Sequence, residues 1–136
     1  MGFAQVIVDA SAVISVLTNE EDAELMREAL LDAVSSRMSA VNWMEVSIRV
    51  LRLAEPRLEA LFDELIAQAN CEVVSVTPDQ ANIAREAYRR FGKGSGHEAK
   101  LNMGDCFAYA LATASGEALL FKGDDFARTD IAAALA

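Results

Sequence analysis

Short segments with strand composition alternate along this chain with longer amphipathic segments. Strand signals fall at 6–8, 37–39, 72–76 and 118–121, and helical periodicity falls at 10–17, 20–34, 42–53, 58–69, 77–90 and 102–115. Strands that alternate with helices form a parallel sheet whose two faces are covered by those helices. We therefore expect an α/β fold, a three-layer α/β/α sandwich around a central, mainly parallel sheet.

Two segments have the spacing of a capping box, in which a polar N-cap residue and an acid three residues later satisfy each other's backbone N–H groups. Asn42 is followed by Glu45, and Asn102 is followed by Asp105. We expect helices to begin at these two asparagines. Gly116 is placed to end the second of them in a left-handed conformation.

Some apolar side chains are expected in the core because of their helical spacing. On the helix at 20–34 the face expected to be buried contains Ala23, Met26, Leu30 and Val34. On the helix that follows Asn42, the large apolar residues are Trp43, Met44, Leu51 and Leu53. These four side chains would serve either the core or a subunit interface, and burial in the core is the preferred interpretation.

Length and composition indicate one soluble globular domain. The chain has 136 residues, of which 53% are hydrophobic and 24% are charged, and no apolar run approaches the ~20 residues that span a bilayer. No basic segment typical of a secretory signal begins the chain, and Val6 stands where a myristoylation motif requires Ser or Thr. Cys71 and Cys106 are expected to be buried thiols in a reducing compartment, rather than a redox pair. The expected location is the cytoplasm.

The net charge of −9 at first argues against a nucleic-acid partner, because phosphate backbones attract basic surfaces. The charge is unevenly distributed, however. Residues 85–100 contain five basic and two acidic side chains, a local balance of +3 that leaves −12 on the rest of the chain. Two interpretations remain open: a basic rim beside an acidic, cation-binding pocket, or a solvated helix face that is rich in arginine.

Four acids occupy positions that a parallel sheet would bring to one edge. Asp9 ends the first strand and Asp124 closely follows the last, while Glu45 and Asp105 lie at helix starts. Each alone is explained by a cap or a turn. Together they would repel one another unless a cation neutralised them, and oxygen ligands without histidine or thiolate suit Mg²⁺ or Mn²⁺. Such ions serve phosphoryl chemistry.

Four segments carry a resemblance to a known family. They are Val-Asp-Ala-Ser-Ala at 8–12, Asn-x-x-Glu at 42–45, Asn-x-Gly-Asp-Cys-x-x-Tyr-Ala-x-Ala at 102–112, and Leu-Phe-Lys-Gly-Asp-Asp-Phe at 120–126. In this order and at these separations they resemble the PIN-domain nucleases, more specifically the VapC-type toxins of bacterial toxin–antitoxin pairs. The resemblance extends over about 6–131 and implies a single PIN-like nuclease domain at 1–136.

The resemblance also implies which residues form the site. Asp9, Glu45, Asp105 and Asp124 match the acidic quartet that holds one or two Mg²⁺ or Mn²⁺ ions. Asp124 is preferred as the fourth metal ligand. The adjacent Asp125 would point elsewhere or support the ligands without binding the metal. Ser11 matches a supporting hydroxyl, although a helix cap explains it equally well. The side chains expected to hold the RNA backbone are Arg89, Arg90, Lys93 and Lys122, with solvated surface as the alternative for each.

The implied activity is hydrolysis of RNA phosphodiester bonds to products with a 5′-phosphate, without a covalent intermediate. The implied partners are a small antitoxin that covers the site and a second copy of the chain, with a larger toxin–antitoxin complex possible. The alternative function is a catalytically inactive PIN-like module that binds RNA or protein. A haloacid-dehalogenase-like phosphatase would require an aspartate where Ser11 stands, and a receiver domain would require two acids after the first strand.

Overall fold

The computed structural model describes residues 5–135, so the amino-terminal residues, for which the sequence predicts no signal or acylation, lie outside the described part. The strands are β1 (Gln5–Val8), β2 (Ser35–Ser39), β3 (Cys71–Val74) and β4 (Ala118–Leu120). The helices are α1 (Ala10–Leu17), α2 (Ala23–Asp32), α3 (Ala40–Leu53), α4 (Pro56–Gln68), α5 (Pro78–Phe91), α6 (Met103–Ser115) and the 3₁₀ helix η1 (Phe126–Arg128). Among the described residues, no helix has the length and apolar character needed to cross a membrane.

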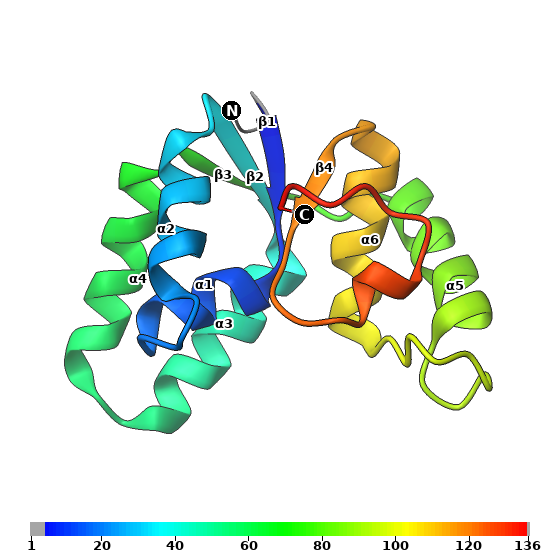
Figure 1. Cartoon of the computed structure of the whole chain (residues 1–136), viewed down its shortest axis with the longest axis horizontal. Coiled ribbons are helices and arrows are strands. Elements are labelled where there is room, and N and C mark those ends of the chain that lie inside the picture. The colour runs from blue at the N-terminus through cyan, green and yellow to red at the C-terminus, as the bar shows by residue number, and fades with distance from the viewer. Residues whose placement is uncertain (1–4, 136) are drawn as a thin grey trace.

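The four strands form one sheet in the order β3-β2-β1-β4, and all three pairings are parallel. Helices α1 to α4 lie on one side of this sheet, and α5 and α6 lie on the other (Figure 1). The expected α/β/α sandwich is confirmed. A strand in the middle of such a sheet buries both faces, and β1 does so: Ile7 points into the core beneath α5 and α6, whereas Val6 and Val8 point into the core beneath α1 to α4.

The two predicted capping boxes have different outcomes. The box at Asn102 is confirmed: its side chain accepts from Asp105 N at 2.9 Å, and Asp105 Oδ2 accepts from Asn102 N at 3.0 Å. The box at Asn42 is wrong. Helix α3 begins at Ala40 with Ser39 as its N-cap, because the Ser39 hydroxyl already accepts from the backbone N–H two residues later. Asn42 is instead a buried side chain inside the helix.

The predicted core faces are correct in part. Ala23, Met26 and Leu30 of α2 are buried, but Val34 is 74% exposed because the helix ends at Asp32 and the chain then becomes extended. On α3, Trp43 is half-buried against Phe62, with ring centroids 6.0 Å apart. The preference for the core is wrong for the other three large apolar residues of this helix, which are exposed: Met44, Leu51 and Leu53.

Candidate functional site

Asp9 lies at the carboxyl edge of the sheet, directly after β1, and it is almost completely buried, with 3% of its surface exposed. Its backbone N–H donates to Leu120 O at 2.9 Å, which holds it against the end of β4. Its Oδ2 accepts from Ser11 N at 3.0 Å and so caps α1. Its Oδ1 is also buried and has no hydrogen-bond partner. A buried carboxylate oxygen without a partner is costly, and a ligand on that side of Asp9 would remove this cost.

Glu45 is held beside the start of α6 by the buried Asn42. The Asn42 Nδ2 atom donates to Glu45 Oε1 at 2.7 Å and to Gly104 O at 3.0 Å, a contact that joins α3 to a residue 62 positions away. A Cβ atom on Gly104 would overlap the Glu45 carboxylate. Only glycine at 104 therefore lets this acid approach the α6 backbone. Neither supporting role is predicted from the sequence, although a glycine in the first turn of a helix is an unfavourable choice that signals close packing.

Ser11 and Asp105 are also fixed by backbone contacts. The Ser11 hydroxyl accepts from Lys122 N at 2.9 Å and therefore ties the segment after β4 to α1. Its hydrogen bonding to Asp9 lowers the pKa of that carboxyl, against the larger effect of burial. Of the two explanations left open for Ser11, helix capping is wrong for its hydroxyl, because the N-cap of α1 is Asp9. Support of the site stays a prediction. Asp105 is oriented by the capping box at the start of α6.

The acids influence one another electrostatically. Burial raises the pKa of Asp9 to about 6, and the charge of Glu45 adds to the rise. Burial likewise raises the pKa of Asp105 to about 6, with further increases from the charges of Asp9 and Asp125. The pKa of Glu45 is raised by burial and then by the charge of Asp105. Asp9, Glu45 and Asp105 therefore lie close enough to act on one another's charge, and their role as metal ligands stays a prediction.

The residues present fit a hard divalent cation. Within 5–135, no three acid, histidine or cysteine side chains are close enough to coordinate one ion as they stand. Their mutual repulsion and the unpartnered Asp9 Oδ1 are nevertheless the two features that a bound cation would relieve. All the donors are oxygen atoms, the set that Mg²⁺ and Mn²⁺ prefer.

The raised pKa of Asp9 predicts how stability depends on pH without divalent ions. Its folded pKa of about 6 lies above the ordinary 3.8, so the folded state binds more protons than the unfolded state between these values. The free energy of unfolding should therefore fall as the pH rises from about 4 to about 6, by about 3 kcal/mol for this buried group. Urea denaturation in EDTA from pH 4 to 7 measures the free energy of unfolding at each pH. The Asp9→Asn variant, which lacks this titrating group, is the reference. A constant difference between the two proteins would contradict the expected shift.

Asp124 and Asp125 both lie exposed in the loop that follows β4. This loop turns at Gly123, whose φ of +99° favours glycine. Asp124 is the fourth acid expected from the sequence. The pKa of Asp105, however, is raised by the charge of Asp125, which makes Asp125 the nearer of the two in electrostatic terms.

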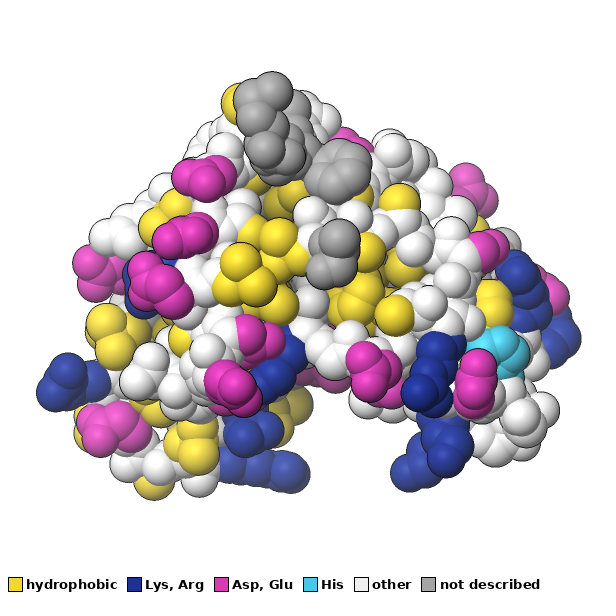
Figure 2. Space-filling model, in the orientation of Figure 1, with side chains coloured by type: hydrophobic (Ala, Val, Ile, Leu, Met, Phe, Trp, Pro, Cys, Tyr) yellow, Lys and Arg dark blue, Asp and Glu magenta, His cyan; other side chains and the backbone are white. Residues whose placement is uncertain are grey.

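The basic side chains expected to contact RNA differ in their surroundings. Three of the four are paired with acids: Lys122 with Glu20 and Asp22, Arg89 with Glu86, and Arg90 with Asp130. Lys93 has no ion-pair partner within 5–135, and neither does Arg85, which the predicted set omitted. Figure 2 shows a notch in the lower edge of the molecule, with Lys and Arg side chains on both rims.

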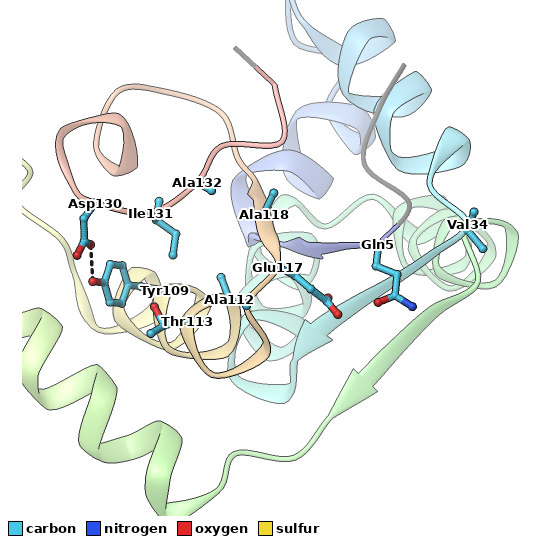
Figure 3. Close-up of a pocket in the computed structure, with 11 residues that line it drawn as sticks. Gln5, Val34, Tyr109, Ala112, Thr113, Glu117, Ala118, Asp130, Ile131 and Ala132 are labelled. Carbon is cyan, nitrogen blue, oxygen red and sulfur yellow. Dashed lines mark hydrogen bonds between the residues drawn. The ribbon is translucent and has the colours of Figure 1, made fainter.

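A cavity of about 610 Å³ lies away from these acids. It is lined by Gln5 and Ala118, which begin β1 and β4, so it is at the amino edge of the sheet (Figure 3). The Tyr109 hydroxyl donates to Asp130 at its wall. Because ligands of parallel α/β sheets bind at the carboxyl edge, the acid cluster rather than this cavity is the candidate active site.

Comparisons with known proteins agree with the fold. The PIN-domain family matches residues 6–132. The chain is 46% identical over 125 residues to VapC ribonuclease Mb2780c of Mycobacterium bovis, covering 92% of this chain and 95% of the relative. It is also 46% identical over 129 residues to ribonuclease VapC28 of Mycobacterium tuberculosis, covering 95% and 97%.

Solved structures show the same fold. The crystal structure of Mycobacterium tuberculosis VapC20, described as a sarcin-ricin loop cleaving toxin, matches with a TM-score of 0.73 at 16% identity, over 93% of this chain and 95% of that one. A toxin–antitoxin complex from Klebsiella pneumoniae matches with a TM-score of 0.64 at 17% identity, over 90% of both chains. The sequence matches span almost the whole chain and include its coupled acids, so the chain belongs to the PIN-domain family and, within it, to the VapC group.

Proposed function

We propose that this chain is a metal-dependent endoribonuclease that hydrolyses RNA phosphodiester bonds as the toxin of a toxin–antitoxin pair. The observation that carries the proposal is the buried Asp9, coupled to Glu45 and Asp105 at the carboxyl edge of the sheet in a VapC-group chain. The names of the relatives support ribonuclease activity. Metal dependence is supported by the acids themselves, because carboxylates grouped in this way need a counter-charge.

The proposed ligands are Asp9, Glu45, Asp105 and one acid at 124–125, holding one or two Mg²⁺ or Mn²⁺ ions. When bound, such an ion polarises the phosphate, lowers the pKa of water and neutralises the charge that develops on the oxygens. The protein contributes orientation. Asn42 holds Glu45, and the backbone of Asn102 holds Asp105. Since the pKa values of Asp9 and Asp105 are about 6, both acids are largely ionised at neutral pH and able to bind a cation.

Incubation of the purified chain with a 5′-labelled single-stranded RNA tests the proposal. Cleavage is expected with Mg²⁺ or Mn²⁺, with new 5′-phosphate ends, and none is expected in EDTA. Cleavage that continues in EDTA and leaves cyclic phosphate ends would exclude a metal-dependent mechanism. Binding of RNA without cleavage under either ion would favour the alternative, an inactive PIN-like binding module.

Separate substitution of each of the two neighbouring acids identifies the fourth ligand. We favour Asp125, because its charge raises the pKa of Asp105, over Asp124, which the sequence analysis preferred. Asp125→Asn should lower the cleavage rate by about 10- to 100-fold, and Asp124→Asn should change it less. Both variants remove one negative charge from adjacent exposed positions, so each is the control for the other. A larger loss of cleavage rate with Asp124→Asn would identify Asp124 as the fourth ligand instead.

Protein partners are supported by exposed apolar side chains on α2, α3 and α4. These are Leu25, Leu31, Met44, Ile48, Leu51, Leu53 and Leu61. Met44, Ile48 and Leu51 recur at helical spacing and form an exposed apolar row on α3, which supports a surface there that another protein covers. We propose a small antitoxin and a second copy of the chain as partners, with a larger complex of both, in the cytoplasm. Sedimentation of the chain alone and with a co-expressed antitoxin distinguishes the two contacts.

A further inference from the structure

A second cavity lies between α5 and the start of α6, on the other side of the sheet from the exposed apolar row. Its volume is about 540 Å³ and its wall is mostly apolar. The side chains that define it are Arg85, Tyr88, Lys93, Asn102, Met103 and Phe107. The acid site does not use this cavity, and of the side chains expected to contact RNA it is lined by Lys93 alone.

The cavity adjoins the acid site through one residue. Asn102 lines the cavity and is also the N-cap of α6, where its backbone N–H donates to Asp105 Oδ2 at 3.0 Å. The cavity and the support of the Asp105 carboxylate therefore share the residue Asn102. A polymer whose phosphate lies at the acids would have its neighbouring unit within reach of this cavity.

Tyr88 forms a fixed aromatic surface at the cavity, although 46% of it is exposed. Its hydroxyl donates to Lys93 O at 3.0 Å, and its ring packs so closely on Gly92 that a Cβ atom there would overlap it. The hydrogen bond and the packing on Gly92 both restrain the ring, so stacking on it would cost less side-chain entropy than stacking on an unrestrained side chain. Phe107 supplies a second ring to the same cavity.

Arg85 and Lys93 give the cavity a positive charge in a chain whose net charge is −9. Neither forms an ion pair with another residue of the described part. A flat apolar surface with two free cations complements a nucleotide, which combines a flat base with an anionic phosphate. It is unfavourable for symmetric packing against a second copy, because a two-fold contact would bring the same cations together.

We propose that the cavity between α5 and α6 binds a nucleobase of single-stranded RNA, stacked on Tyr88, next to the phosphate that lies at the acid site. Arg85 and Lys93 hold the phosphates that flank this base. The assignment rests on the proposed ribonuclease function. The wall offers few polar atoms, so the subsite selects an unpaired base by its shape rather than reading its hydrogen-bonding edge.

Binding measurements in an Asp9→Asn background, where cleavage is blocked, test the subsite. The probes are a fluorescein-labelled 12-nucleotide RNA with all four bases and an abasic ribose-phosphate oligomer of the same length. Tyr88→Ala should weaken RNA binding by about 5- to 150-fold, the range for loss of one stacked base, and leave the abasic oligomer unaffected. Tyr88→Phe keeps the ring and should retain RNA binding. Val73→Ala, which removes an exposed apolar side chain on β3, is the matched control and should change neither.

Photo-cross-linking locates the base without relying on a variant. An RNA that carries 5-iodouracil, irradiated with the Asp9→Asn chain, should cross-link to Tyr88 or Phe107, as identified by mass spectrometry of the tryptic peptides. Cross-links confined to other elements would overturn the subsite. Unchanged RNA binding by Tyr88→Ala would also overturn it, and so would loss of dimer in sedimentation of Tyr88→Ala, because the cavity would then be a subunit interface.

These outcomes are separate from those that judge the ribonuclease itself. If the native chain cleaves RNA and Tyr88→Ala binds it normally, the subsite is wrong and the proposed function stands. If the native chain cleaves nothing while RNA still binds through Tyr88, the proposed function is wrong and the subsite stands.

Discussion

Replacement of Asp9 by asparagine is expected to lower metal-dependent RNA cleavage by about a thousandfold, the scale of a contribution worth several kcal/mol. The side chain keeps its size, so the hydrogen bond from Ser11 N can persist. The negative charge and the unpartnered Oδ1 acceptor are lost, and these are the features that attract a cation. The rate of cleavage of a labelled RNA, measured with saturating Mn²⁺, gives the loss directly.

Removal of one negative charge outside the acid site provides the control for Asp9→Asn. Asp63 lies on the exposed side of α4, and the Asp63→Asn variant should cleave RNA at the native rate. The Asp9→Asn chain should also be at least as stable as the native chain in EDTA at neutral pH, because the charge it removes is disfavoured by burial. Retention of a tenth or more of the native activity would show that Asp9 does not hold an essential ion.

Alanine in place of Gly104 is expected to lower cleavage by about 100-fold, the upper range for residues that orient metal ligands. The new methyl group would occupy the position of the Glu45 carboxylate. Glu45 would have to move and would lose its hydrogen bond from Asn42. The fold should tolerate the change, because the displaced group ends a flexible side chain and alanine is favoured over glycine in a helix by about 1 kcal/mol.

A second substitution distinguishes displacement of Glu45 from general damage. Glu45→Asp shortens the acid by one methylene group and withdraws it from the new methyl. The double variant of Gly104→Ala with Glu45→Asp should therefore be no less active than Gly104→Ala alone, whereas independent effects would multiply. Thermal unfolding of all three variants, followed by circular dichroism, should give midpoints close to the native value. A fall in the midpoint that matches the loss of activity would mean that Gly104 supports the fold rather than Glu45.

Local signals in the sequence predicted the helices, the strands and the acids. Two examples are the capping box of Asn102 and Asp105 and the buried strand that ends at Asp9. Each is defined by residues a few positions apart, so it can be predicted from the local sequence. The alternation of elements then implied a parallel sheet, and a parallel sheet implied that acids following its strands meet at one edge.

Contacts between distant segments were decided only by the tertiary structure. Asn42 has the spacing of a cap, yet its amide binds Glu45 and Gly104 because α3 packs against the start of α6. Lys122 carries a charge suited to RNA, yet it pairs with Glu20 across 102 residues. In such cases the packing of whole helices and strands determines the partner. A short segment of sequence does not contain that information. The sequence by itself thus determined the fold class and the acids, whereas the packing decided which side chains hold the acids and which cations stay free beside Tyr88.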